Sequence, residues 1–426
     1  MSISQPCTGG TDVPTTALQP EQLRVRMYRV GFGDCFLVSV PAPGGHRHIL
    51  IDCGVHFRGN IKTLPQVIEN LRAETADRID LVVVTHAHQD HISGFGAHPR
   101  EWAEVTVNEI WMPWTEDPTD GQAVALRTKQ LSLARQLREH LHLTRQLKPA
   151  TEDILENFVG FNLVSNANSM RVARGGFKGP QKVRYLEAGD THTDAAGIPA
   201  LQAQVLSPSR DESVLTKMDP PAGQRWLRAH ARAAPGSETV EPFHPFRRTR
   251  SELARRAAAC VLERKLERQL HNAVIADDAL AMTLDDVLNN TSLVLLLRVA
   301  GSALLFPGDA QWGNWSTWLK ENGADALLNE ITFFKVGHHG SHNSTPRSIV
   351  PKLGHPELAA MISTQGLPFK SIPRQNLLTE LTAQCHRRTV RSDWVKVQNA
   401  PNVAGPKNLP RPFKRGPLWI DYLRKL

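Results

Sequence analysis

The chain has 426 residues, 41% of them hydrophobic and 22% charged, which is the composition of an ordinary soluble globular protein with a large core. Lysine and arginine outnumber aspartate and glutamate by 50 to 42, a balance that favours anionic partners such as nucleic acid or phosphate esters. No stretch approaches the ~20 uninterrupted apolar residues that a membrane-spanning helix requires, so we expect no membrane association.

The first 22 residues are polar, with neither a basic start nor an apolar centre, and predict a disordered leader instead of a secretory signal. We expect one domain over residues 23–400 and a basic C-terminal tail over residues 401–426. The cysteines are odd in number, scattered and without CxxC spacing, which predicts free thiols and a cytoplasmic, reducing location. They are Cys7, Cys35, Cys53, Cys260 and Cys385.

Strand and helix patterns alternate through the first part of the chain. Residues 24–40 predict two strands separated by a tight turn at residues 31–34, and residues 48–51 predict a third strand. A short helix is expected at residues 64–72, and further strands at residues 79–84 and 105–112.

The strand at residues 79–84 runs directly into the sequence THAHQDH, which contains three imidazoles and one carboxylate. These ligand-type residues are His86, His88, Asp90 and His91. Imidazole suits zinc, and an added carboxylate also admits manganese or iron. A solvated histidine cluster is the alternative, but it would need no fixed spacing behind a buried strand. The run therefore predicts a metal site.

The second part of the chain has a different composition. Residues from about 115 to 285 predict a largely helical insertion, and the elements expected within it and after it are as follows. Helices are predicted at 122–146, 251–270, 312–322 and 374–386, and strands at 183–186, 200–206, 292–297, 303–306, 331–336 and 358–363. Arginines are frequent between residues 225 and 268, where a solvated helix face and a binding surface remain alternatives.

Three further strand ends carry ligand-type residues. Asp52 follows the strand at 48–51, Asp309 follows that at 303–306, and His338 with His339 follows that at 331–336. Taken alone, such an aspartate is more often a turn former or helix cap, and a single histidine is more often a surface or core residue. Because ligands in layered α/β folds gather at one edge of the sheets, the repetition predicts that these residues meet in one site.

The HxHxDH pattern at residues 86–91 resembles the signature of the metallo-β-lactamase superfamily, and the chain is most similar to the metallo-hydrolase domain of the ComEC competence proteins. The resemblance covers roughly residues 24–395 without the insertion. The segments that carry it are VGFGD at 30–34, LIDCG at 50–54, AGD at 188–190, VLSP at 205–208, NNTSLVL at 289–295, GDA at 308–310 and KVGHHGS at 335–341.

This resemblance implies an α/β fold of four layers, the αββα metallo-β-lactamase sandwich, with two divalent ions at one edge, zinc in the first place and manganese as the alternative. His86 and His88 would bind the first ion. Asp90 and His91 would bind the second, with His338 as its further ligand and His339 as the alternative to His338. Asp309 would bridge the ions, and Asp52 would orient ligands through hydrogen bonds. No third protein ligand for the first ion is identified between residues 91 and 309.

The predicted function is metal-dependent hydrolysis, in which a dinuclear site activates a bridging hydroxide and Asp90 and Asp309 are the catalytic carboxylates. The resemblance and the positive charge favour cleavage of phosphodiester bonds in an anionic substrate, nucleic acid included. Hydrolysis of another ester or a lactone is one alternative. A nucleic-acid-binding or partner-binding effector with a structural metal site is the other. The oligomeric state is left open.

Overall fold

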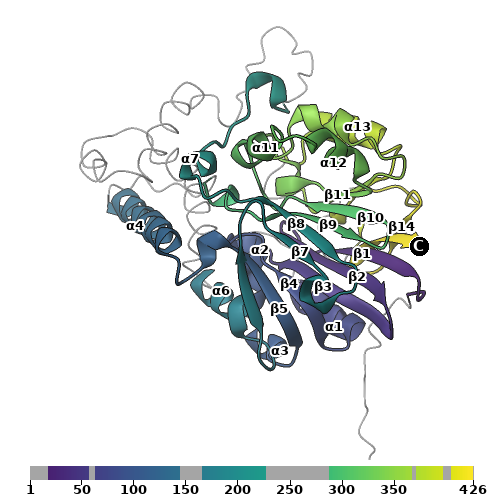
Figure 1. Ribbon diagram of the computed structural model, residues 1–426, viewed down its shortest axis with the longest axis horizontal. Helices are drawn as coiled ribbons and strands as arrows, with labels where there is room; N and C mark the ends of the chain where they lie inside the picture. The colour runs from purple at the N-terminus through teal and green to yellow at the C-terminus, as the bar shows by residue number, and fades with distance from the viewer. Residues whose placement is uncertain are drawn as a thin grey trace, which may run out of the picture.

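The computed structural model describes residues 18–56, 63–143, 166–226, 287–366, 371–396 and 404–425. These residues form two facing β-sheets with helices on both outer sides (Figure 1). The predicted α/β fold of four layers, αββα, is therefore confirmed.

The first sheet has eight strands in the order β14-β15-β1-β2-β3-β4-β5-β6. Its strands from β3 to β6 are parallel, which brings the carboxyl ends of β3 and β4 to the same edge. The strands are β1 (Gln22–Tyr28), β2 (Cys35–Ala42), β3 (Gly45–Cys53), β4 (Arg78–Val83), β5 (Thr106–Pro113), β6 (Lys182–Leu186), β14 (Phe413–Arg415) and β15 (Trp419–Lys425).

The second sheet has seven strands in the order β13-β12-β11-β10-β9-β8-β7. Here the strands from β10 to β13 are parallel, so the carboxyl ends of β10, β11 and β12 also share an edge. The strands are β7 (Thr191–Thr193), β8 (Gln202–Ser207), β9 (Val294–Val299), β10 (Ser302–Phe306), β11 (Phe333–Lys335), β12 (Ala359–Ile362) and β13 (Thr389–Arg391).

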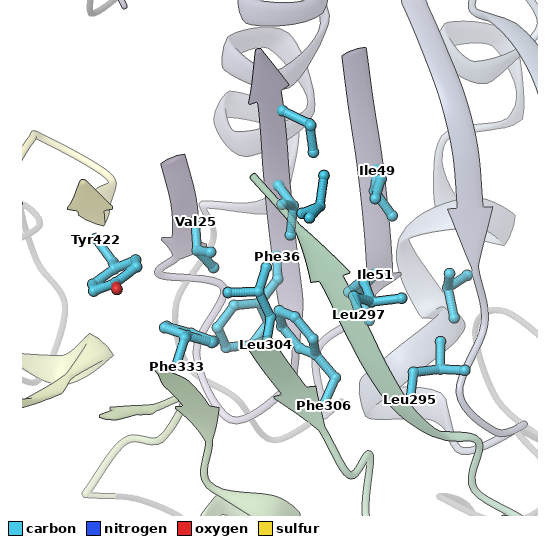
Figure 2. Packing of buried hydrophobic residues seen from close by; sticks show 14 of the residues in the cluster. Val25, Phe36, Ile49, Ile51, Leu295, Leu297, Leu304, Phe306, Phe333 and Tyr422 are labelled. Carbon is cyan, nitrogen blue, oxygen red and sulfur yellow. The ribbon is translucent and has the colours of Figure 1, made fainter. Parts of the chain in front are cut away.

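Apolar side chains from both sheets interlock in the middle of the sandwich. Alternate residues of each strand point inward, as the two-residue period of a strand requires. Figure 2 shows Val25 and Phe36 of the first sheet close to Leu304 and Phe306 of the second, and the rings of Phe36 and Phe306 have centroids 5.9 Å apart. Complete burial of one such side chain contributes about 1.5–3 kcal/mol, so this core fixes how the two sheets face one another.

Helices cover the outer faces of the two sheets, each through a separate apolar cluster. The first sheet is covered by α1 (Leu64–Thr75), α2 (Gln89–Ala97), α3 (Pro99–Trp102) and α6 (Asn166–Gly175). The second is covered by α11 (Trp312–Trp318), α12 (Ala324–Glu330) and α13 (Gln375–Gln384). In the described part of the chain, no helix combines the length and the apolar character needed to cross a membrane.

The prediction of a basic tail over residues 401–426 is wrong for residues 413–425. They form β14 and β15, and β15 pairs with β1 from Gln22 opposite Lys425 to Tyr28 opposite Trp419. The basic residues made this segment look like a solvated tail, although its Ile420 and Tyr422 belong to the inner core. Residue 22, predicted as part of the leader, is the first residue of β1, and residues 1–17 lie outside the described residues.

The predicted insertion at about 115–285 is too wide. β6 pairs with β5 in the first sheet and β8 pairs with β9 in the second, so residues 182–207 contain parts of the central sandwich. The helix predicted at residues 122–146 is confirmed over its described part as α4 (Gly121–Leu143). The helix predicted at residues 251–270 lies outside the described residues.

Candidate metal centre

The ligand-type residues of five strand ends meet at one edge of the sandwich. Asp52 lies near the end of β3, the histidine run follows β4, and Asp309 follows β10. The pair 338–339 follows β11, and Ser363 follows β12 directly. The sequence predicted that the first four of these segments form one site, and the distances between their side chains agree with that expectation, whereas Ser363 was not among the predicted site residues.

Four buried residues form a compact group. Asp90, His91, Asp309 and His339 each offer a ligand atom, and these atoms all lie within 4.8 Å of one another. His339 Nε2 is 3.1 Å from Asp90 Oδ2, and His91 Nε2 is 3.2 Å from Asp309 Oδ2. Because two carboxylates and two imidazoles converge where water is excluded, the group has the charge and the donor atoms that zinc or manganese binds.

His86 and His88 lie directly beside this group. His86 Nε2 is 3.0 Å from His88 Nδ1, and the rings of His86 and His91 have centroids 4.2 Å apart. Burial lowers the pKa of His86 well below its usual value and lowers the pKa of His88 to about 4. Both rings are therefore neutral near pH 7, the form in which imidazole coordinates a cation. Among the described residues, neither joins a group of three or more ligand atoms within 4.8 Å.

Asp52 lies behind His91, with its carboxylate fully buried. It accepts hydrogen bonds from the Thr85 amide at 2.7 Å and from the Thr85 hydroxyl at 2.6 Å, and its Oδ2 lies 2.8 Å from His91 Nδ1. This contact uses one nitrogen of the His91 ring and leaves Nε2 facing Asp309. Carboxylates that hold metal-binding histidines act in this way, so the geometry supports the orienting role predicted for Asp52, which stays a prediction.

The structure brings His339 into the four-residue group and places His338 at its border. Both residues have left-handed backbone angles, with φ of 43° at His338 and 52° at His339, so the chain turns sharply after β11. His339 is completely buried, and its Nδ1 lies 2.9 Å from the carbonyl of Ser363. The side chain of His338 is 19% exposed, and its Nε2 lies 3.9 Å from Asp309 Oδ2.

We expect replacement of His339 by alanine to weaken binding of manganese or zinc by at least about tenfold, because His339 faces both Asp90 and Asp309. The same substitution at His338 should weaken binding less, because that side chain is 19% exposed and lies outside the four-residue group. Ion content after dialysis and titration calorimetry would measure both effects. A larger loss in His338→Ala than in His339→Ala would contradict this assignment and favour His338 as the ligand.

Two buried residues of the centre were not among the predicted site residues. Asp34, from the VGFGD segment, forms a second group of ligand atoms within 4.8 Å together with Asp52 and His91. Lys335, from the KVGHHGS segment, makes an ion pair with Asp34. Both lie in segments that carry the family resemblance, which is the signal that could have identified them. Cys35 and Cys53 are buried free thiols and belong to neither ligand group.

The residues present fit a divalent ion. Asp90 is 4% exposed, and its Oδ1 accepts no hydrogen bond from the residues that the structure describes. A buried acceptor without a partner is destabilising, and a bound cation would remove that penalty. The neutral imidazoles of His86 and His88 are ready to coordinate without losing a proton. The centre therefore has the properties of a preformed cation site.

Part of the chain is similar to a known protein family. Residues 28–198, less than half of the chain, match the family model described as Metallo-beta-lactamase superfamily. Among solved structures, the crystal structure of the metallo-beta-lactamase fold protein YhfI from Bacillus subtilis is similar at 9% sequence identity and a TM-score of 0.36, covering 87% of this chain and 96% of that one. No curated protein matches the chain. The likeness to the ComEC type stays a prediction, whereas residues 28–198 carry a metallo-β-lactamase superfamily domain match that includes the whole histidine run.

Proposed function

We propose that the protein is a metal-dependent hydrolase that uses two divalent ions, zinc or manganese, to cleave phosphodiester bonds. One observation carries the proposal: the buried group of Asp90, His91, Asp309 and His339 has its ligand atoms within 4.8 Å of one another. Members of the superfamily that residues 28–198 match are generally metal-dependent hydrolases. A buried site of this donor composition therefore supports hydrolysis over a purely structural role.

The donor atoms suggest how two ions would be divided. His86 and His88 would hold one ion, and Asp90, His91 and His339 would hold the other, with Asp309 between them. When bound, the ions would supply Lewis acidity toward the substrate oxygen and would lower the pKa of a water molecule toward neutrality. Among the described residues, three protein ligands including Asp309 would then hold the first ion, and four including Asp309 would hold the second.

The chain's own residues prepare the reaction in distinct ways. Asp52 holds the ring of His91 through Nδ1, and the carbonyl of Ser363 lies at Nδ1 of His339. Both rings are thereby fixed with Nε2 toward the carboxylates. Asp90 Oδ1, which accepts no hydrogen bond from the described residues, can orient the attacking water by accepting its hydrogen. These contacts position the reacting groups before the substrate arrives, which lowers the barrier to hydrolysis.

The substrate class rests on charge and on the family resemblance. A formal net charge of +8 attracts anions, and the segments shared with the ComEC-type domain favour phosphodiesters, nucleic acid included. Carboxylic esters and lactones would use the same metal chemistry. They remain the enzymatic alternative.

A substrate panel tests the proposal. The protein is supplied with manganese or zinc and assayed on bis(p-nitrophenyl) phosphate, single- and double-stranded DNA, RNA, cyclic dinucleotides and p-nitrophenyl esters. We expect cleavage of at least one phosphodiester, its loss after treatment with EDTA, and its return when the metal is restored. Cleavage of esters alone would overturn the substrate class. Absence of all hydrolysis, together with undiminished binding of nucleic acid by the metal-free protein, would favour the binding effector.

A further inference from the structure

Lys335, the last residue of β11, has a fully buried ammonium group. Its side chain is 2% exposed, which is rare for lysine unless the charge is paired. The ammonium forms an ion pair with Asp34, donates to the carbonyl of Gly308 at 3.0 Å and lies 3.4 Å from Asp309 Oδ1. Three acceptors thus surround a group with three donors, so none of its hydrogens is left for a substrate.

The two oxygens of Asp309 have different surroundings. Oδ1 accepts a hydrogen bond from the amide of His338 at 3.1 Å and lies next to Lys335. Oδ2 faces the imidazoles, at 3.2 Å from His91 Nε2 and 3.9 Å from His339 Nε2. Lys335 and the backbone therefore hold one oxygen, and only the other is directed toward the candidate metal position.

Asp34 connects the ammonium group to the opposite sheet. It lies directly before β2, whereas Lys335 belongs to the second sheet, so the ion pair joins both sheets at the edge that contains the site. Asp34 Oδ1 is 3.7 Å from His339 Nδ1, and Asp34 Oδ2 is 3.8 Å from His91 Nδ1. The ammonium group thus neutralises a carboxylate that lies behind two of the imidazoles.

We propose that Lys335 is a positioning residue for the metal centre: its ammonium group fixes Asp309 so that Oδ2 alone faces the ions. This inference rests on the proposed function, because it assumes that ions bind beside Asp309. In such a centre, loss of the group that orients a ligand typically lowers metal affinity by about 10–100-fold.

Lys335→Met tests this role, because it removes the charge and keeps an unbranched apolar chain. We expect Co²⁺ to bind about 10–100-fold more weakly and with an altered visible absorption spectrum, which reports on ligand geometry. Titration calorimetry and absorption spectroscopy measure these effects without requiring a substrate. Lys352→Met is the matched control, since Lys352 is 41% exposed and pairs with Asp325 away from the centre.

The single variant leaves the charge of Asp34 buried without its partner and could fail to fold for that reason alone. The double variant Asp34→Asn with Lys335→Met removes both charges and should fold. The ammonium group that lies beside Asp309 would still be missing. Co²⁺ binding by the folded double variant that is weaker than binding by Asp34→Asn alone, with an altered spectrum, supports the inference. Affinity and spectrum equal to those of the wild type would overturn the role of Lys335 alone. Absence of Co²⁺ binding by the wild type would overturn the proposed function as well.

Discussion

Replacing Asp309 by asparagine is expected to abolish both metal retention and hydrolysis. Its Oδ2 lies 3.2 Å from His91 Nε2 and 3.9 Å from the Nε2 atoms of His338 and His339. Asparagine preserves the shape of the side chain but removes the negative charge that would attract the ions beside the imidazoles. The rate on bis(p-nitrophenyl) phosphate should fall by more than the 10–100-fold that loss of a supporting hydrogen bond costs at metal sites.

Two measurements separate this effect from general damage to the protein. Ion content by mass spectrometry should fall along with activity, and the far-ultraviolet circular dichroism spectrum should stay unchanged. Asp325→Asn is the matched control, because Asp325 is 71% exposed and forms its ion pair with Lys352, away from the centre. An Asp309→Asn protein that keeps both its ions and its activity would show that the buried carboxylate has no part in the metal centre.

The fold could be predicted because each sequence segment that resembles the family lies at a strand end. Local sequence patterns mark the strand at 79–84, the histidine run after it and the Asp309 turn. Such patterns can be recognised without knowing which strand pairs with which. The sandwich core then brings those ends to one edge. The meeting of these strand ends was expected from the resemblance and from the rule that ligand-binding residues in α/β folds lie at the ends of strands. The distances in the group of Asp90, His91, Asp309 and His339 agree with this expectation.

The assignment between His338 and His339 could not be predicted in the same way. Spacing from the strand favours His338, because it comes first after β11. Two successive left-handed residues then reverse the expected order, and His339 becomes the completely buried one. Positive φ at a residue other than glycine is uncommon and depends on the surrounding structure, which sequence position does not reveal.

Long-range charge pairing explains why the C-terminal strand and the burial of Lys335 were not predicted. The segment 413–425 has enough basic residues to resemble a solvated tail, yet its Asp421 pairs with Arg26, which is 395 positions away in the chain. In the sequence, nothing distinguishes Lys335 from an exposed lysine at a strand end. Its burial follows from the ion pair with Asp34, which only the fold brings close. Burial of a charge is decided by a partner that is distant in sequence, so the local charge pattern alone predicts neither pair.

Replacing Asp421 by alanine is expected to destabilise the protein by about 3–5 kcal/mol, the usual effect of removing one partner from a buried ion pair. Arg26 is completely buried, and Asp421 binds it through two hydrogen bonds, from Nε at 2.7 Å and from Nη2 at 2.9 Å. Glu74 and Asn70 would remain near Nη1 but cannot replace the two bonds that are lost. The free energy of unfolding from urea titration would measure the change.

A control on the same strand separates buried charge from strand pairing. Arg424 of β15 pairs with Glu357, which is 64% exposed, so Glu357→Ala should change stability by no more than about 1 kcal/mol.

Replacing both Arg26 by methionine and Asp421 by leucine should recover much of the stability that Asp421→Ala loses, because apolar residues often replace a buried ion pair without destabilising a protein. Glu74 would keep its ion pair with Arg24 in that variant. If Asp421→Ala changes stability no more than Glu357→Ala does, the C-terminal strand is not held by this pair. If the double variant stays as unstable as the single one, the loss of stability comes from the packing of β15 against β1 and not from the loss of Asp421 as a partner of Arg26.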